Sequence, residues 1–323
     1  MLFRLRPQSI AYCVRIVSAN CGGPAARYSY RLMKTLCLTA LLGFALQTGV
    51  AQAQERFSPF VPSDQDNVER MLKLAQLKDD DVVVDLGSGD GRIVLTAARM
   101  NKKLRGFGVD IDEKLVIESN AAARAQGVAD RVQFFHRNAF DADLREATVI
   151  AMWLWPEMQI LLRPVILAQA RPGTRVITNL WDLGSWKPDV EDLEPQRVVM
   201  WVVPARVEGY WSWELSIDGR PVAYSAIKEQ RFQVVEGVVR AGNRREVLQD
   251  IKLRGEDISF TLMQTIDRVG FVRHAFRGKV HGDTIEGTAS VSLPPHEKTI
   301  ELPWRATRTA TSAYFDPTGT NVE

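Results

Sequence analysis

The chain has 323 residues, of which 46% are apolar and 25% charged, as in ordinary globular proteins. This length suffices for two domains, and the composition excludes a disordered chain and a protein that crosses a membrane many times. The net charge of +2 conceals an asymmetry, because residues 1–53 hold six cations and no acid, which leaves 35 basic against 39 acidic residues in 54–323. A mildly acidic body argues against a nucleic-acid partner, which requires a concentrated basic face.

Residues 33–53 have the pattern of a signal peptide. Met33 and Lys34 precede an apolar run from Leu36 to Val50, and Ala51-Gln52-Ala53 forms a small-x-small cleavage site. The run is short for a membrane span, which takes ~20 residues. We therefore expect export to the periplasm, and the alternative is a membrane anchor that gives membrane contact through residues 33–53.

Residues 1–32 show no clear periodicity, and we expect a non-native or unstructured extension before a true start at Met33. All three cysteines lie in the segment that export would remove, so the mature chain would form neither a disulfide nor a Cys-ligated zinc site. The histidines at 136, 274 and 281 lack metal-ligand spacing, and we expect surface or structural roles for them and no metal site.

Between residues 54 and 203 strands and helices alternate. A helix is expected after Ser63, its predicted N-cap, with Val68, Met71, Leu72 and Ala75 on one face. The expected strands are 81–86, 105–109, 131–135, 147–154 and 174–180, and further helices are expected at 93–100, 113–126 and 159–170, the last interrupted near Pro164. This order predicts a doubly wound, Rossmann-like α/β fold with a parallel sheet, whose ligand lies outside the carboxyl ends of the strands.

Residues 204–307 lack helical periodicity and predict a smaller antiparallel β-barrel or sandwich domain. Short alternating runs punctuated by glycine occur at 210–215, 222–227, 231–235, 258–263 and 284–291. A weak repeat of 252–258 in 279–285 suggests two hairpins, each with a Gly-acid turn. Period two places Trp211 and Trp213 on one face, which we interpret as core. Residues 308–323 are expected to form a flexible tail.

The strongest chemical signal is the segment Asp85-Leu86-Gly87-Ser88-Gly89-Asp90-Gly91 directly after the first buried strand. Its three glycines allow a sharp turn and a close approach of the backbone to a ligand, with amide N–H groups at a helix start. A dinucleotide site would have glycine where Arg92 stands, so the spacing favours S-adenosylmethionine (SAM) over a nicotinamide. The alternative is a glycine-rich turn without a ligand.

Polar residues after the next two strands complete the predicted cofactor site. Asp110 can accept hydrogen bonds from both ribose hydroxyls, or it is a solvated loop acid. Asn138 is predicted to bond the adenine amino group while Phe140 packs on the ring, and Asp90 either faces the methionine amino group or shapes the loop. The neighbouring residues Ile111 and Ala139 are included in the site.

The segment Trp153-Leu154-Trp155-Pro156 follows the fourth strand, where the methyl acceptor is expected. Trp153, Trp155 and Pro156 are the predicted catalytic residues, because two tryptophans can form an apolar channel that desolvates a lysine amine and lowers its pKa. Methyl transfer depends chiefly on proximity and alignment, and requires no general acid. Alternatively, either tryptophan belongs to the core. The chain has no Asn-Pro-Pro-Tyr motif, which argues against methylation of nucleic acid.

These motifs resemble those of class I SAM-dependent methyltransferases. Over roughly residues 57–190 the chain is similar, more narrowly, to the ATP synthase c-subunit lysine methyltransferase family and, more distantly, to Dot1-like enzymes. The similarity rests on 60–63, 68–71, 85–94, Leu162-Arg163-Pro164 and Trp186-Lys187-Pro188. It implies that the segment Pro62-Ser63 folds over the cofactor and that Asp110 replaces a glutamate, and it does not extend to the β-rich part.

We therefore expect a SAM-dependent methyltransferase that N-methylates a protein lysine, with a β domain that binds the substrate or a partner. A rival from another class is an exported, non-catalytic binding module that retains a SAM-type pocket, because SAM is made in the cytosol. A third alternative is a small-molecule or lipid methyltransferase. The oligomeric state is left open.

Overall fold

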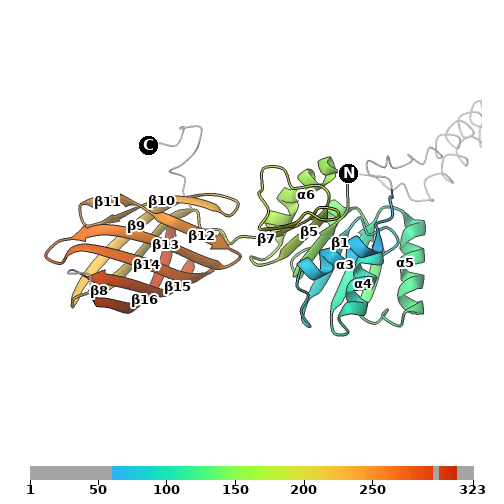
Figure 1. Ribbon diagram of the computed structural model, residues 1–323, viewed down its shortest axis with the longest axis horizontal. Helices are drawn as coiled ribbons and strands as arrows, with labels where there is room; N and C mark the ends of the chain where they lie inside the picture. The colour runs from blue at the N-terminus through green and yellow to red at the C-terminus, as the bar shows by residue number, and fades with distance from the viewer. Residues whose placement is uncertain (1–59, 294–297, 311–323) are drawn as a thin grey trace, which may run out of the picture. The chain divides into compact units, whose positions relative to one another are not determined.

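The computed structural model describes residues 60–293 and 298–310, which form an α/β part followed by an antiparallel β part (Figure 1). The predicted extension, the signal peptide or anchor, and the end of the tail from residue 311 lie outside these residues. Within the described ranges, no helix has both the length and the apolar character needed to span a bilayer.

The α/β part is built on a seven-stranded sheet in the order β3-β2-β1-β4-β5-β7-β6. Its strands are β1 (Val82–Leu86), β2 (Arg105–Asp110), β3 (Val132–His136), β4 (Val149–Met152), β5 (Arg175–Asn179), β6 (Val190–Asp192) and β7 (Val198–Val202). Strands β1 to β5 are parallel, which confirms the predicted Rossmann-like fold.

The sheet is mixed rather than purely parallel, which corrects the prediction. Strand β7 runs antiparallel to β5, and β6 runs antiparallel to β7. The chain returns after β5 without a crossover helix, and parallel pairing needs such a crossover. The sequence pattern did not predict either strand.

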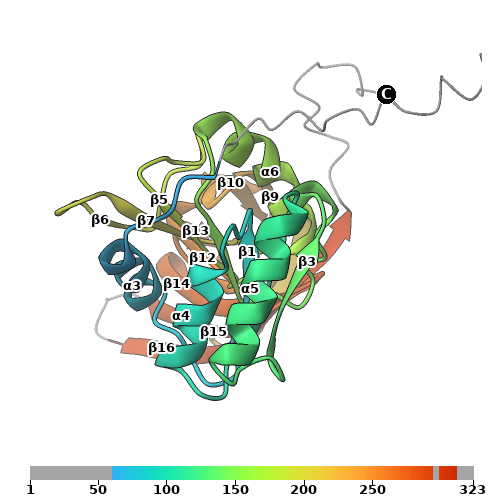
Figure 2. The ribbon, with the colours of Figure 1, turned by 90° about the vertical axis from the view of Figure 1, so that its right-hand side faces the viewer.

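Helices cover both faces of this sheet (Figure 2). They are α3 (Gln65–Leu74), α4 (Arg92–Met100), α5 (Glu113–Ala125) and α6 (Pro156–Gln169). Successive side chains of a strand point to opposite faces. Val83 accordingly packs in the cluster with α3, α4 and α5, whereas Val84 packs in the cluster with α6.

Two helix details differ from the prediction. The N-cap of α3 is Asp64 and not Ser63, because the Asp64 carboxylate accepts from the Asp66 backbone N–H at 3.0 Å. Helix α6 begins with Pro156 and continues through Pro164 without an interruption. Packing of Leu162 and Ile166 against the sheet outweighs the single hydrogen bond that a proline removes.

The β part is a nine-stranded antiparallel sheet in the order β11-β10-β9-β8-β16-β15-β14-β13-β12. The strands are β8 (Gly209–Ile217), β9 (Arg220–Arg231), β10 (Val234–Ala241), β11 (Arg244–Val247), β12 (Gln249–Arg254), β13 (Asp257–Ile266), β14 (Gly270–His281), β15 (Thr284–Leu293) and β16 (Lys298–Ala310). Because β10 also contacts β12 and β11 contacts β13, the sheet curls into a nearly closed barrel, as predicted (Figure 1).

Some strand assignments in the barrel were wrong. The expected strand 231–235 contains the turn between β9 and β10, where Phe232 has φ +58°. Strand β14 begins at Gly270, well before the part expected from the repeat at 279–285, and β16 continues to Ala310 rather than ending at 307. The repeat is confirmed as two hairpins, β12–β13 and β14–β15.

Aromatic side chains fill the barrel. Trp211 and Trp213 are buried as predicted, together with Trp304, Phe260 and Phe276. His274 is not at the surface, because it is fully buried and its Nε2 lies 2.8 Å from the Tyr224 hydroxyl, whereas the side chains at 136 and 281 are exposed.

Candidate active site

The glycine loop after β1 forms a cradle of backbone amides at the start of α4. Gly87, Gly89 and Gly91 have φ values of +83°, +52° and +80°, the left-handed region that favours glycine. The N–H groups of Gly87 and Ser88 donate to the Val109 carbonyl at 2.9 Å, which ties the loop to β2. A Cβ at Gly89 would lie 2.4 Å from the Phe60 ring. The loop therefore has a fixed shape that larger residues cannot adopt.

Asp110, at the end of β2, faces this loop as predicted. Its Oδ2 accepts from the Gly89 N–H at 2.8 Å, and its Oδ1 accepts from the Asp112 N–H at 2.9 Å. A carboxylate offers about four acceptor positions, so each oxygen keeps capacity for one more donor. Asp110 thus combines a fixed orientation with the ability to bind a pair of hydroxyl groups.

Asp85, inside β1, is a buried acid without a partner. It is 1% exposed, and neither carboxylate oxygen has a hydrogen-bond partner among the described residues. Burial, followed by the nearby charges of Asp110 and Asp90, raises the pKa of Asp85 to about 8. Because an unpaired buried polar group is costly, this position suits a cationic ligand group beside the cradle.

Asp90 has a structural partner, unlike Asp85. Its carboxylate forms an ion pair with Arg92, whose Nε lies 2.9 Å from Oδ1. The Arg92 guanidinium also donates to the Ser63 carbonyl, which holds the segment before α3 against the loop. Ser63 is buried and Pro62 exposed. Of the two predicted roles of Asp90, this arrangement favours shaping the loop.

The residues predicted to contact adenine lie in a short turn after the third strand. The Asn138 Oδ1 accepts from the Phe140 N–H at 3.1 Å, so the oxygen expected to bond adenine caps a short 3₁₀ turn at Ala139–Asp141. Ala139 and Phe140 are half-buried against the core. The Ile111 carbonyl lies 3.0 Å from His136 Nε2.

The two tryptophans after β4 point to different surroundings. Trp153 packs against the core on the α3 side of the sheet, whereas Trp155 is 48% exposed at the start of α6, next to Pro156. Leu154, between them, packs on the glycine loop, where its side chain would lie 2.5 Å from a Cβ at Gly87. Leu154 therefore borders the glycine loop.

Two buried amides near the ends of β4 and β5 were missed by the sequence analysis. Gln159 is fully buried, its Nε2 donates to the Leu154 carbonyl at 2.8 Å, and its Oε1 has no partner in the described structure. Asn179, the last residue of β5, is fully buried with neither amide atom paired within the described ranges. Leu180 follows with φ +66°. For Asn179, the sequence signal that could have indicated the site was a polar residue at the end of a buried strand.

These features fit a SAM molecule. The close approach that the glycine turn allows, the two-fold acceptor at Asp110 and the unpaired carboxylate of Asp85 match the body of the ligand, its ribose and its ammonium, respectively. Within the described residues, no group of three or more His, Cys, Asp and Glu side chains has the arrangement of a metal site.

Comparison with known proteins agrees with this chemistry. Residues 85–190 match the family described as ANTKMT methyltransferase domain. An ATP synthase c-subunit lysine N-methyltransferase from Xenopus laevis is 28% identical over 131 residues, which are 41% of this chain and 57% of that protein. The chain thus spans little more than half of that relative.

A solved RNA methyltransferase from Salinibacter ruber in complex with S-adenosyl-L-homocysteine is 44% identical and has a TM-score of 0.44. The match covers 46% of this chain and 96% of that one. A protein-lysine N-methyltransferase from Saccharolobus islandicus is 37% identical over 130 residues, 40% of this chain and 81% of that protein. With most of that relative matched, and with the SAM cradle in place, the chain belongs to the protein-lysine N-methyltransferase family of SAM-dependent methyltransferases.

Proposed function

We propose that the protein transfers the methyl group of SAM to the side-chain amine of a lysine in another protein. The observation that carries the proposal is the glycine cradle with the buried, unpaired Asp85 beside it and Asp110 fixed on the Gly89 amide. SAM supplies a methyl group on a sulfonium, and the carbon–sulfur electrons remain with sulfur as the new nitrogen–carbon bond forms.

The residues of the chain bind and orient rather than exchange protons. Asp110 accepts the ribose hydroxyls, and Asp85 pairs with the ammonium of the methionine part, which then keeps that carboxylate ionised. Phe60 covers the loop at Gly89 and helps to exclude water. Rate enhancement then comes from alignment of the amine with the methyl group.

For the acceptor we assign Asn179 and Gln159. Their unpaired amide oxygens, beyond β4 and β5, can each accept an N–H from a neutral amine and fix the direction of its lone pair. Because both amides are fully buried, an amine bound to them is shielded from water, which disfavours the charged form of lysine and lowers the pKa of the amine. Trp155 and Pro156 lie at the rim of this region rather than at its centre.

The rim beyond these amides suits an apolar segment of a protein. Large apolar side chains are exposed on the first turns of α6 and on the connection after β5, and these two segments approach each other at Ile160 and Gly184. They are Trp155, Ile160, Leu161, Leu180 and Trp181. Monomeric proteins rarely expose such groups together unless they bind a partner. The relative from Xenopus laevis is named for a lysine of the ATP synthase c-subunit. The exposed apolar rim leads us to propose an apolar segment of a protein as the substrate here.

We further propose that residues 33–53 direct export to the periplasm or, if uncleaved, hold the protein on the membrane. Sequencing of the native N-terminus tests this, because cleavage predicts Gln54 as the first residue. A peptide that contains residues 25–30 would instead refute a start at Met33.

The test is transfer of label from methyl-labelled SAM into a cell-envelope extract, followed by hydrolysis and a search for methyl-lysine. The Asn179→Leu variant is expected to lose at least about tenfold in kcat/KM with unchanged affinity for S-adenosylhomocysteine, since a single buried hydrogen bond is worth roughly 1.5 kcal/mol. Label in a lipid or small molecule would support the third alternative instead. Binding of S-adenosylhomocysteine with no methyl transfer to any acceptor would support the non-catalytic binding module instead.

A further inference from the structure

The barrel has a hollow at one end that the methyltransferase chemistry does not use. It has a volume of about 610 Å³ and lies among the turns of the hairpins β8–β9, β10–β11 and β13–β14. Ligand sites in proteins commonly have volumes of about 300–1,000 Å³, and the mouths of β-barrels are a frequent location. Size and location thus suit a small organic ligand.

The rim of this hollow is cationic. Each of the three hairpins contributes one arginine, Arg220, Arg244 and Arg268, against the single acid Asp267. Arg244 lies 3.9 Å from Asp267, and the other two arginines have no ion-pair partner within the described ranges. Guanidinium groups bind carboxylate, sulfonate and phosphate through paired N–H donors. An anionic group is the complement of this rim.

The floor of the hollow is apolar and covers a buried amide. Val222 and Ile266 line it, and both are at inward-facing positions of their strands. Gln264, two residues before Ile266 on the same inward face of β13, is 1% exposed. Its Nε2 donates at 3.4 Å to the carbonyls of Ala241 and Arg244, and both of these residues line the hollow. Its Oε1 has no partner in the described structure. An unsatisfied polar group therefore lies directly beneath an amphipathic depression.

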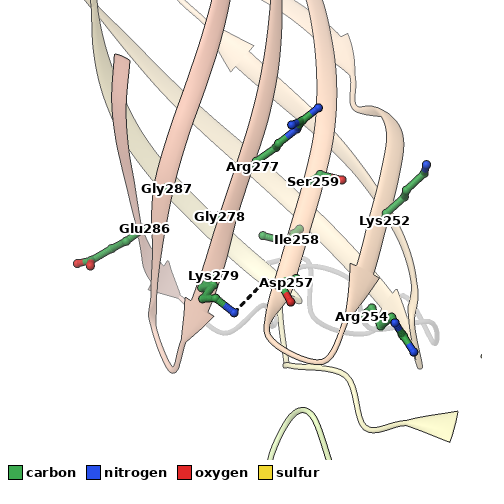
Figure 3. Close-up of a pocket in the computed structure, with 10 residues that line it drawn as sticks. All are labelled: Lys252, Arg254, Asp257, Ile258, Ser259, Arg277, Gly278, Lys279, Glu286 and Gly287. Carbon is green, nitrogen blue, oxygen red and sulfur yellow. Dashed lines mark ion pairs between the residues drawn. The ribbon is translucent and has the colours of Figure 1, made fainter. Parts of the chain in front are cut away.

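A second hollow of about 510 Å³, on the outer face of β12 to β15, provides a contrast. Four cations (Lys252, Arg254, Arg277 and Lys279) and two acids line it, which gives the same net charge of +2 as the three arginines and one acid of the first hollow. Lys279 forms an ion pair with Asp257 at 2.9 Å (Figure 3). Outward-facing side chains dominate its lining. It serves as a charge-matched control.

We propose that the hollow framed by Arg220, Arg244 and Arg268 binds a small amphipathic organic anion, with the anionic group at the arginines and the apolar part on Val222 and Ile266. Tight turns, with φ +73° at Gly219 and +58° at Gly242, fix the rim before the ligand binds. This site is independent of the cofactor cradle and of methyl transfer.

The test uses a matched pair of fluorescent probes on the full chain, with S-adenosylhomocysteine present to fill the cofactor site. Anilinonaphthalene sulfonate carries the anionic group, and phenylnaphthylamine has the same rings without it. We expect the sulfonate to bind at least about tenfold more tightly, because charge-assisted hydrogen bonds to arginine are the stronger ones. Equal binding of both probes would overturn the proposal.

The variant Arg244→Gln/Arg268→Gln is expected to weaken sulfonate binding about tenfold or more, whereas Lys252→Gln/Arg277→Gln removes the same charge from the second hollow and leaves binding unchanged. Equal loss in both double variants would show that net charge alone attracts the probe. Ala223→Trp, which fills the hollow from its exposed wall, is expected to abolish binding while the thermal midpoint of unfolding is retained.

Competition then distinguishes the sources of the anion. Displacement of the sulfonate by octanoate indicates a free organic anion, and displacement by phosphatidylglycerol vesicles alone indicates a lipid headgroup. Displacement by neither would contradict the proposed chemistry.

Discussion

The α/β part and the barrel both bury polar groups without partners, but in different places. In the α/β part, Asp85, Ser88, Gln159 and Asn179 lie in or just beyond the carboxyl ends of β1, β4 and β5. In the barrel, the unpaired atoms of Lys228 and His274 belong to inward-facing residues of β9 and β14. An unpaired buried group is therefore no site by itself. Its convergence with others at one edge of a parallel sheet is what indicates a ligand.

The two regions also differ in the sign of the buried charge. Asp85 lies beside two further acids, so burial and repulsion act together and raise its pKa. Lys228 lies among aromatic faces, with its Nζ 4.7 Å from the centre of the Trp211 ring and 5.6 Å from that of Phe260. Aromatic faces partly compensate a buried cation. The acid is therefore mostly neutral in the ligand-free protein below about pH 8 and suits a cationic ligand group, whereas the lysine amine lies against aromatic rings of the core.

The largest effect is expected when a side chain is added to the glycine loop of the cofactor site rather than to an ordinary hairpin turn. Gly89→Ala and Gly219→Ala both place a side chain at positive φ, but only Gly89 has neighbours within 4 Å. We expect Gly89→Ala to raise the dissociation constant for S-adenosylhomocysteine by roughly 100-fold, or about 3 kcal/mol, as strain and lost contact combine. Calorimetry measures this. Gly219→Ala should cost about 1 kcal/mol of stability and no affinity, and an equal loss in both variants would remove the distinction.

Asp85→Asn tests whether the buried carboxyl of Asp85 has no compensating partner in the ligand-free protein. A carboxyl with an ordinary pKa of 3.8 and a folded-state pKa of about 8 destabilises the ligand-free protein increasingly as the pH rises between these values. One proton changes the free energy of unfolding by at most about 1.4 kcal/mol per pH unit. Urea unfolding at pH 4.5 and pH 8 should show this decline in the wild type and a flatter profile in Asp85→Asn.

The same variant should bind S-adenosylhomocysteine roughly tenfold more weakly, because it lacks the charge that pairs with the ligand ammonium. Parallel pH profiles of the two proteins would mean that Asp85 already has a compensating partner.

Lys228→Met probes the buried charge of the barrel. Burial, with the nearby charge of Arg308, lowers the pKa of Lys228 from 10.5 to about 7. A depressed lysine pKa removes stability as the pH falls from the unfolded-state value to the folded-state value, so the penalty is complete below about pH 7. We expect Lys228→Met to stabilise the protein by about 1–4 kcal/mol at pH 6 and by less at pH 9.5. The exposed change Lys252→Met should have no such effect in urea titrations, and a destabilised Lys228→Met would point to a role for the amine.

The smallest effect is expected at the exposed rim of the acceptor region. Trp181→Ser should raise the KM for the protein acceptor about fivefold, equivalent to about 1 kcal/mol, with kcat and affinity for S-adenosylhomocysteine unchanged. Val247→Ser, an exposed apolar position on the barrel, is the matched control. A change in kcat instead would place Trp181 at the reacting atoms.

The sequence by itself determined the elements whose signals are local. The order of strands and helices, the turn at Gly87, Gly89 and Gly91, and the placement of Asp110 after β2 followed from residue periodicity and from the conformations that glycine permits. The alternation at Trp211 and Trp213 likewise predicted the barrel core. Each of these rests on residues within one strand, one turn or one helix.

Only the tertiary structure decided which neighbours those residues meet. The antiparallel return of β7 and the bond from the Arg92 guanidinium to the Ser63 carbonyl depend on segments distant along the chain. The unpaired state of Asp85 and Asn179 is likewise invisible in the sequence, since pairing is a property of the surroundings and not of the residue type. Burial and hydrogen-bond partnership arise from packing between elements, and local patterns constrain them only weakly.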